Sequence, residues 1–103
     1  MEEHTLERYC FILEVNPGRE DDYDRVHREM FPDMKAALQA AGYTNYTIFR
    51  LGTTVCGYAE CVPDVATVLA KYAADPVRER WAAAMGGIAR QRLQQAVEVW
   101  RLE

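Results

Sequence analysis

The sequence predicts an α+β fold in which four strands and two helical segments follow one another in the order βαββαβ. Four short stretches, at residues 8–15, 44–51, 54–61 and 96–102, alternate in polarity or are rich in aromatic and β-branched residues, as strands are. Between the first two, and again between the last two, apolar residues recur at helical spacing. This order is typical of the ferredoxin-like arrangement, an antiparallel sheet with helices on one face.

The first strand, at residues 8–15, has apolar residues on both faces. One face carries Tyr9, Phe11, Leu13 and Val15, and the other carries Cys10 and Ile12. Helices on one side of the sheet leave the second face uncovered. The economical cover is a second copy of the same sheet, which predicts a homodimer in the form of a dimeric α/β barrel.

The longest apolar stripe lies within residues 21–38 and contains one histidine. Its members follow one another at three- and four-residue steps and so share one helix face: Tyr23, Val26, His27, Met30, Met34 and Leu38. Acidic residues at 20–22 favour a helix start there because the helix dipole attracts negative charge. Pro32 removes an amide donor inside the pattern, so we expect the helix to kink or restart there.

Gly42 is expected to end this helix, and Gly52-Thr53 to connect the second strand to the third, at residues 54–61. One face of the third strand has unusually small side chains. They belong to Val55, Gly57 and Ala59. Small side chains allow either close packing of a neighbour or a cavity, and the sequence leaves both open.

Two shorter helices are expected between the third and fourth strands. Pro63-Asp64 opens the first, and Asp75-Pro76 opens the second with an acid at the N-cap and a proline in the first turn. The apolar face of the second helix includes Val77, Trp81, Ala84, Met85 and Ile88. Trp81 is therefore expected to face the core or a pocket in it. The alternation over residues 96–102 predicts the last strand.

Length and charge narrow the classes of function. With 103 residues, half of them hydrophobic, we expect one domain over residues 1–103. A net charge of −4 with interleaved signs argues against nucleic acid, which requires a basic patch. No apolar stretch approaches the roughly 20 residues that cross a bilayer, and the N-terminus lacks a signal pattern, so we expect a cytoplasmic protein with no membrane partner.

The sequence predicts no metal site. Its three cysteines fit neither a disulfide framework nor a CxxC motif. A site built from His4, His27, Cys56 and Cys61 would have none of the usual ligand spacings. The glycine-rich, P-loop, HExxH and GxSxG motifs of nucleotide, metal and nucleophilic chemistry are also missing from the sequence.

His27 is the leading candidate for chemistry. A helix face that only packs would more cheaply carry Leu or Ala there, because a buried imidazole needs hydrogen-bond partners. The alternative is a core histidine satisfied by a neighbouring carbonyl. Tyrosines and a tryptophan on the other inward stripes suit a neutral polyol, since aromatic faces pack on sugar C–H groups while phenol and imidazole bind hydroxyls.

Five segments together resemble the L-rhamnose mutarotase family, in the same order and with similar spacing. They are Leu13-Glu14-Val15-Asn16-Pro17, Tyr23-Asp24-Arg25-Val26-His27, Phe31-Pro32-Asp33-Met34, Asn45-Tyr46-Thr47-Ile48 and Arg80-Trp81. The resemblance implies a dimeric α+β barrel without metal or organic cofactor that interconverts the α and β anomers of a six-carbon deoxy sugar. It also implies that His27 is the catalytic proton donor, and that Tyr23, Tyr46 and Trp81 bind this small-molecule monosaccharide. The family typically has two adjacent tryptophans where this chain has Trp81-Ala82, which leaves the identity of the sugar open.

The residues suit the chemistry of this family. Mutarotation requires a protonated ring oxygen and a deprotonated anomeric hydroxyl, and a histidine with a pKa of about 6.5 can give and take protons in turn. One alternative is a non-catalytic ligand-binding or assembly module on the same dimeric scaffold. Another is an enzyme of the monooxygenase or cyclase type. Neither alternative explains why Tyr23, His27, Tyr46 and Trp81 occur together.

Overall fold

The computed structural model describes residues 5–90 and 93–102. Its elements in chain order are β1 (Glu7–Glu14), α1 (Glu20–Arg28), α2 (Pro32–Ala41), β2 (Tyr43–Leu51), β3 (Thr54–Cys61), α3 (Val65–Ala73), α4 (Val77–Ala84) and β4 (Gln94–Gln95). The predicted βαββαβ order is therefore present, with each helical segment divided into two helices.

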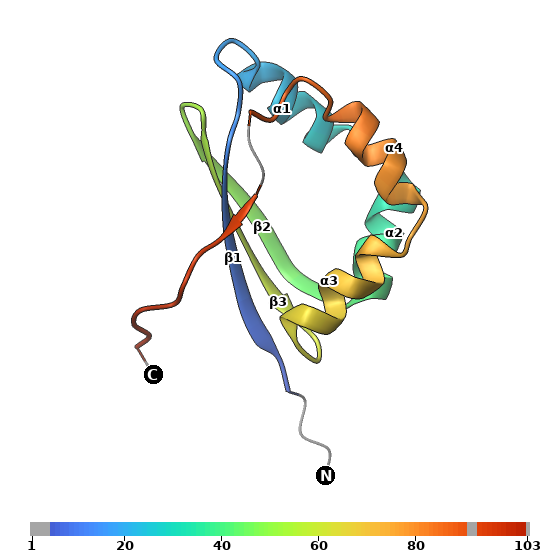
Figure 1. The fold of residues 1–103 in the computed structure, drawn as a ribbon, viewed down its shortest axis with the longest axis vertical. Coiled ribbons are helices and arrows are strands. Elements are labelled where there is room, and N and C mark those ends of the chain that lie inside the picture. The colour runs from blue at the N-terminus through green and yellow to red at the C-terminus, as the bar shows by residue number, and fades with distance from the viewer. Residues whose placement is uncertain (1–4, 91–92, 103) are drawn as a thin grey trace.

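The four strands form one antiparallel sheet in the order β2-β3-β1-β4. β1 and β3 pair along their full lengths, with Phe11 opposite Gly57. The four helices lie on one side of this sheet, and α4 runs from the region of α2 and α3 toward α1 (Figure 1). The strand order and the two layers confirm the ferredoxin-like fold. Within one chain the sheet is open, so closure into a dimeric barrel stays a prediction.

Pro32 restarts the helix rather than kinking it. α1 ends at Arg28, and α2 begins with Pro32 at its first position, where the missing amide proton is not needed. Gly42 ends α2 as expected, with a φ of 114°. A Cβ atom there would lie 2.3 Å from the Val62 carbonyl oxygen, so both the backbone angle and the close approach require glycine.

The predicted start of α3 is confirmed by a side-chain cap, whereas α4 begins one residue later than predicted, with Pro76 rather than Asp75 at its N-cap. The Asp64 carboxylate accepts a hydrogen bond from the Thr67 amide at 2.7 Å, and the Asp75 carboxylate accepts one from the Val77 amide at 3.0 Å. Each carboxylate satisfies an amide that the first turn of a helix leaves without a partner.

The prediction of a last strand over residues 96–102 is wrong. β4 covers only Gln94–Gln95, which lie opposite Ile12 and Phe11. One further bond joins the Ala96 amide to the Cys10 carbonyl at 2.8 Å, after which the segment leaves the sheet (Figure 1). Alternating side chains suit a strand, but a strand also needs a neighbouring backbone edge, and in the described part of the chain residues 97–102 pair with none.

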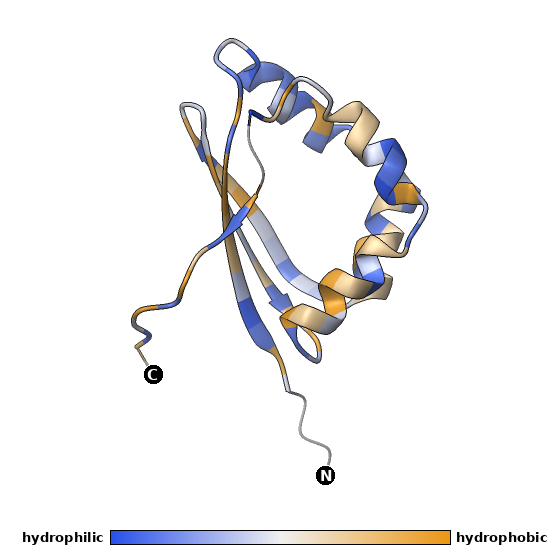
Figure 2. Ribbon diagram, viewed as in Figure 1, coloured by the Kyte–Doolittle hydropathy of each residue, from blue (hydrophilic) through white to orange (hydrophobic). Residues whose placement is uncertain are grey.

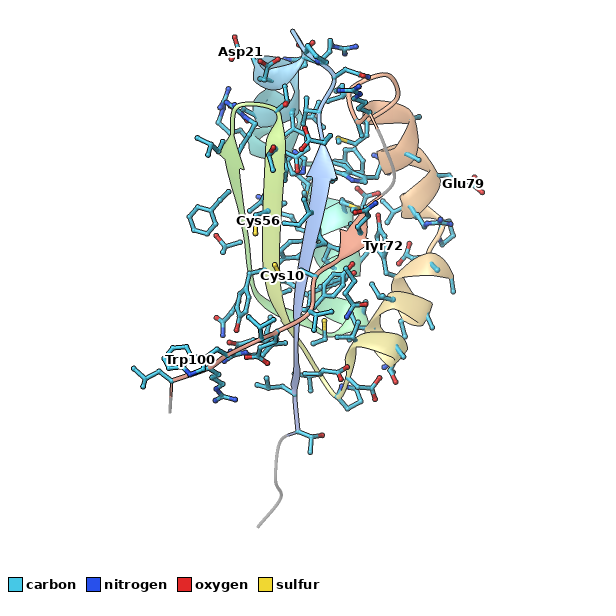
Figure 3. All side chains as sticks on the ribbon, turned by 60° about the vertical axis from the view of Figure 1, so that its left-hand side comes forward. Cys10, Asp21, Cys56, Tyr72, Glu79 and Trp100 are labelled. Atoms are coloured by element: carbon cyan, nitrogen blue, oxygen red, sulfur yellow. The ribbon has the colours of Figure 1, made fainter. Side chains whose placement is uncertain are left out.

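The two faces of the sheet differ in how they are covered. The side chains that point toward the helices are buried, and those of β1 and β3 include Tyr9, Phe11, Leu13, Val55 and Ala59. On the opposite face the Sγ atoms of Cys10 and Cys56 lie 3.6 Å apart (Figure 3), and both cysteines are free thiols. Phe49 and Leu51 from β2 are 66% and 85% exposed.

The small residues of β3 provide close packing. A Cβ atom on Gly57 would lie 2.1 Å from two ring carbons of Phe11, which means that this ring lies directly over the glycine. Val55 and Ala59, on either side of Gly57, are fully buried. The sequence left close packing and a cavity open, and at Gly57 the structure has close packing, with the ring of Phe11 forming part of a cavity wall beyond it.

Candidate functional site

A cavity of about 820 Å³ lies between the helices and the sheet. Its helical side is lined by His27, Met30, Met34, Leu38, Leu69, Tyr72, Ala73, Arg78 and Trp81. Its sheet side is lined by Tyr9, Phe11, Tyr43, Tyr46, Thr47 and Ile48, with Leu93 nearby. The lining is mostly apolar and aromatic with a few polar groups, which is typical of a small-molecule site.

Four of the six members of the apolar stripe predicted over residues 21–38 line this cavity, whereas Tyr23 and Val26 pack in the core. His27 from α1, Met30, and Met34 and Leu38 from α2 all line it, even though the helix is interrupted between them. The restart at Pro32 changes the direction of the chain and keeps the stripe on the cavity wall. Periodicity alone therefore identified the helical wall of the site.

His27 is held in one orientation by its own helix. Its Nδ1 atom lies 2.8 Å from the backbone carbonyl oxygen of Tyr23. Because a carbonyl oxygen can only accept, Nδ1 carries the proton and Nε2 of the neutral ring has a free lone pair. Burial lowers the pKa of His27 from 6.5, opposed by the bond to Tyr23 and the charge of Asp24. The imidazole is therefore a neutral base near pH 7.

Tyr23 lies behind His27 instead of on the cavity wall. Its side chain is only 3% exposed, and its ring centroid lies 4.2 Å from that of His27 at an interplanar angle of 32°. Burial raises the pKa of its phenol to about 12. The two residues are one helical turn apart, so the Tyr23 ring supports the imidazole and its backbone carbonyl fixes the imidazole proton.

A β-bulge in β2 turns Tyr46 into the cavity. The pairing of β2 with β3 shifts by one residue between Thr44 and Thr47, and Asn45 has a φ of 46°. Strict alternation from Tyr43 would have placed Asn45 inward, but the extra residue places Tyr46 there. The Asn45 side chain instead donates to the Glu60 carboxylate at 2.7 Å. As a result Tyr43 and Tyr46 are neighbours, with ring centroids 5.1 Å apart.

The cavity presents several phenols that remain protonated. Burial raises the pKa of Tyr9, Tyr43, Tyr46 and Tyr72, and each ring also lies near another titratable group. Among residues 5–90 and 93–102, the hydroxyls of Tyr9, Tyr43 and Tyr46 make no hydrogen bond to protein. A neutral phenol can both donate and accept, so these hydroxyls are available to a polyhydroxylated ligand.

Trp81 forms the wall next to His27. Its ring meets the imidazole edge to face, with centroids 5.0 Å apart, and meets Phe31 at 5.9 Å. On its other side Phe31 carries the guanidinium of Arg80, 4.3 Å from the ring centroid, and Arg80 forms an ion pair with Asp33. These contacts limit the movement of the indole, which suits a fixed platform for an apolar ligand face.

Of the residues singled out from the sequence, His27, Tyr46 and Trp81 line one cavity, and Tyr23 supports the first of them. Ala82 is exposed and does not line the cavity. Tyr43 and Arg78 also line the cavity, and neither was singled out from the sequence. Arg78 could have been found from its position three residues before Trp81, which places both on one helix face.

Other kinds of site receive no support from the described residues. Within residues 5–90 and 93–102, no three histidine, cysteine or acidic side chains are grouped closely enough to hold a metal ion, and His4 lies outside this part of the chain. The helices of the same part are too short or too polar to span a bilayer.

Comparison with known proteins adds the family. The sequence matches the model of the L-rhamnose mutarotase family over residues 8–102. An L-rhamnose mutarotase from Listeria monocytogenes is 32% identical over 76 residues, covering 74% of this chain and 73% of the relative. One from Opitutus terrae is 36% identical over 83 residues, covering 79% of this chain and 78% of the relative.

Solved structures agree on the fold. The crystal structure of an L-rhamnose mutarotase from Formosa agariphila matches with a TM-score of 0.77 at 22% identity, over 94% of this chain and 99% of that one. A putative antibiotic biosynthesis monooxygenase from Bordetella bronchiseptica reaches 0.75 at 16% identity, over 95% and 99%. At such identities the structures show the fold alone, and the two activities named differ. The sequence matches decide between them: this chain belongs to the L-rhamnose mutarotase family.

Proposed function

We propose that this protein is a sugar mutarotase that interconverts the α and β anomers of L-rhamnose or a related hexose by general acid–base catalysis. In this proposal His27 transfers the proton, Tyr46 and Trp81 contact the sugar, and Tyr23 supports the imidazole of His27 from behind. Family membership supports the reaction. The observation that carries the proposal is the neutral imidazole of His27, oriented through Nδ1 and set in a cavity whose other polar groups are largely phenols.

One imidazole is sufficient for the proton transfers. Nε2 of His27 takes the proton of the anomeric hydroxyl, and the resulting imidazolium gives it to the ring oxygen as the bond from that oxygen to the anomeric carbon breaks. Both oxygens are bonded to the same carbon, so one group reaches both. The open-chain aldehyde rotates, and the same transfers in reverse close the ring on its other face. No electrons are exchanged and no net proton is consumed.

The other residues have binding roles in this proposal. The Trp81 ring provides a platform for the C–H face of the sugar, and the phenol of Tyr46 provides a hydrogen bond to a sugar hydroxyl. Tyr23 contributes mainly through His27, whose ring it contacts and whose proton its carbonyl accepts. Positioned acid–base help of this kind accelerates a reaction roughly 100- to 10,000-fold, which suffices for a process that already proceeds in water.

Anomer exchange of L-rhamnose, measured by saturation-transfer NMR, tests the proposal. We expect His27→Ala to lower the enzymatic exchange rate about 100-fold or more while the circular dichroism spectrum and melting temperature show an intact fold. His27→Gln is the matched control, because glutamine can hydrogen-bond but cannot accept a proton, and it should be equally slow. Unchanged exchange in either variant would contradict the role of His27. Sugar binding by the wild type without faster exchange would favour the binding module.

We further propose that the protein forms a homodimer through the open face of the sheet, and that it is cytoplasmic. Apolar side chains support the dimer: Phe49 and Leu51 are exposed, and hydrophobic residues also mark the C-terminal segment that extends from the sheet (Figure 2). In that segment Trp100 is 73% exposed and lies far from the helices (Figure 3). Sedimentation at micromolar concentration tests the proposal, and a species of 11.8 kDa would contradict it.

A further inference from the structure

Among residues 5–90 and 93–102, the cavity lining contains one permanently charged side chain, and it is positive. That side chain belongs to Arg78, and none of the described lining residues is an aspartate or glutamate. The remaining titratable groups are neutral near pH 7, since burial keeps the phenols protonated and the imidazole of His27 unprotonated. Arg78 is an exposed residue, so its side chain meets solvent as well as the cavity, and no acidic residue of the described chain lines the same wall.

Arg78 differs in this respect from five other arginines of the described residues. Arg8, Arg19, Arg25, Arg50 and Arg80 form ion pairs with Glu98, Asp22, Asp22, Asp24 and Asp33, respectively. Among residues 5–90 and 93–102, no carboxylate pairs with Arg78. Two acidic residues lie near Arg78 along the chain, Glu79 directly after it and Asp75 three residues before it. Asp75 accepts a hydrogen bond from the Val77 amide and lines a different pocket, together with Asp33.

Arg78 also lies where the far end of a bound sugar would be. Residues 78 and 81 are three apart on α4, so their Cβ atoms are about 5–6 Å from each other on one helix face. On the other side of Trp81 is His27, whose ring centroid lies 5.0 Å from the indole. α4 runs from Arg78 toward α1, which carries His27 (Figure 1). A hexose on Trp81 with its anomeric carbon at His27 therefore directs the far side of its ring, carbons 3 to 5, toward Arg78, and carbon 6 extends from carbon 5 on that side.

The neighbours of Arg78 suit an anion at this point. Tyr72 from α3 also lines the cavity, and its phenol lies close enough to the guanidinium for the positive charge to act on it. Tyr72 lies on the inner side of the helical layer, whereas Glu79, the next residue after Arg78, points outward from α4 (Figure 3). The negative charge of Asp75 also acts on the Tyr72 phenol, whose hydroxyl donates to Met34 Sδ at 4.0 Å. When that hydroxyl turns from Met34, the guanidinium and the phenol can donate to the same oxygen atoms.

We propose that Arg78 is a specificity-determining residue that selects hexoses carrying a carboxylate at carbon 6, so that the preferred substrate is a uronate rather than a 6-deoxy sugar. The inference rests on the proposed mutarotase function and deepens it. A planar guanidinium binds a carboxylate through two parallel hydrogen bonds, which favours one singly charged carboxylate over a neutral methyl or hydroxymethyl group. The reaction is unchanged, because carbon 6 takes no part in anomer exchange.

The test compares three sugars that share one ring and differ only at carbon 6. L-Rhamnose has a methyl group there, L-mannose a hydroxymethyl group and L-mannuronate a carboxylate. With the wild-type protein we expect the highest kcat/KM for anomer exchange with L-mannuronate. Arg78→Met should lower that value about tenfold or more and leave L-rhamnose nearly unchanged, while Arg78→Lys should lie between the two. Lys71→Met removes a positive charge from α3 outside the cavity and is the matched control. It should leave the kcat/KM for L-mannuronate and for L-rhamnose unchanged.

Several results would overturn the inference while the proposed function stands. They are exchange of L-rhamnose without preference for L-mannuronate, an equal loss for all three sugars in Arg78→Met, and an effect of Lys71→Met as large as that of Arg78→Met. A preference for L-mannose 6-phosphate over L-mannuronate would assign the site to phosphate and overturn the carboxylate specificity. Salt screens long-range attraction between exposed charges more than it weakens a direct contact. If Arg78 contacts the carboxylate directly, part of the higher kcat/KM for the uronate should therefore persist at 0.5 M salt.

A binding measurement separates the inference from failure of the mutarotase function itself. The chain has two tryptophans, so in Trp100→Phe the fluorescence comes from Trp81 in the cavity. If no sugar exchanges faster than in buffer, the proposed function fails. Titration of this variant with L-mannuronate and L-rhamnose then still decides the role of Arg78. Binding of the uronate that is lost in Arg78→Met supports an anion site, and equal or absent binding of both sugars overturns it.

Discussion

Replacing Gly57 with alanine should push the ring of Phe11 out of place, and the structure gives the size of the conflict. The new Cβ atom would lie 2.1 Å from two ring carbons of Phe11, whereas ordinary contact begins at 3.4 Å. The ring must therefore withdraw by about 1.3 Å to restore ordinary contact. Phe11 is almost fully buried, and its one open side is the cavity, where its ring already meets Tyr46 edge to face at 6.2 Å.

Two effects of opposite sign contribute to the free energy of unfolding. Overpacking of this kind costs about 1–3 kcal/mol. The loss of glycine stabilises the folded state by about 0.4–1 kcal/mol, because the unfolded chain has fewer conformations. We therefore expect Gly57→Ala to destabilise the protein by roughly 1–2 kcal/mol. For a domain of this size the melting temperature falls by about 4–8 °C for each kcal/mol.

A double-mutant cycle with Phe11→Leu identifies the cause. Leucine lacks the ring carbons that the new Cβ atom would meet, so Gly57→Ala should cost little in a protein that already carries Phe11→Leu. We expect a coupling of about 0.5–3 kcal/mol between the two changes in urea denaturation. Anomer exchange should fall in Gly57→Ala as well, because the displaced ring moves toward Tyr46. A Gly57→Ala protein as stable as the wild type, or additive effects, would refute the reasoning.

Three further predictions concern the site and its supports. The kcat/KM of anomer exchange, corrected for the uncatalysed rate, should rise with pH as the lowered pKa of His27 is passed, with a midpoint below 6.5; a midpoint above 6.5 would contradict its action as a buried neutral base. Asn45→Val should weaken sugar binding and lower the free energy of unfolding by about 1–3 kcal/mol in denaturant melts, because a β-branched residue does not tolerate the positive φ of the bulge. Asn45→Gly keeps this backbone angle and should bind sugar more like the wild type. Asp24→Asn should destabilise the protein at pH 7 by breaking the paired hydrogen bonds with Arg50. Because the pKa of Asp24 is lowered, the difference in unfolding free energy between variant and wild type should vanish as acid protonates Asp24. An equal difference in unfolding free energy at pH 2 and pH 7 would argue against the ion pair.

The pH dependence of stability has a definite sign for His27. Its folded pKa is lower than the 6.5 of the unfolded chain, so between these values the unfolded state binds more protons. Stability contributed by the neutral imidazole is therefore complete above pH 6.5 and is lost as the pH falls toward the folded pKa. Asp24 adds a second loss of stability at lower pH, because its folded pKa lies below the usual range of an aspartate.

Much of the fold was predictable because its signals are local. The starts of α3 and α4 depend on carboxylates within three residues of the amides they accept from, and Gly42 ends α2 through its own backbone angle. The alternation of β1 and the helical stripe around His27 are also properties of neighbouring residues. The extent of the last strand was not predictable in this way, because residues 96–102 need a partner edge that the sequence does not specify.

The sequence by itself determined the element order, the helical wall of the site with His27 and Trp81 on it, and the family resemblance that the comparisons confirm. These follow from periodicity and short-range chemistry. Only the tertiary structure decided that β2 bulges at Asn45 so that Tyr46 points inward, that Tyr23 lies behind the imidazole, and that Arg78 lines the cavity. The physical reason is that register and orientation depend on contacts between segments far apart in the chain, and a pattern along one segment carries no information about its partner.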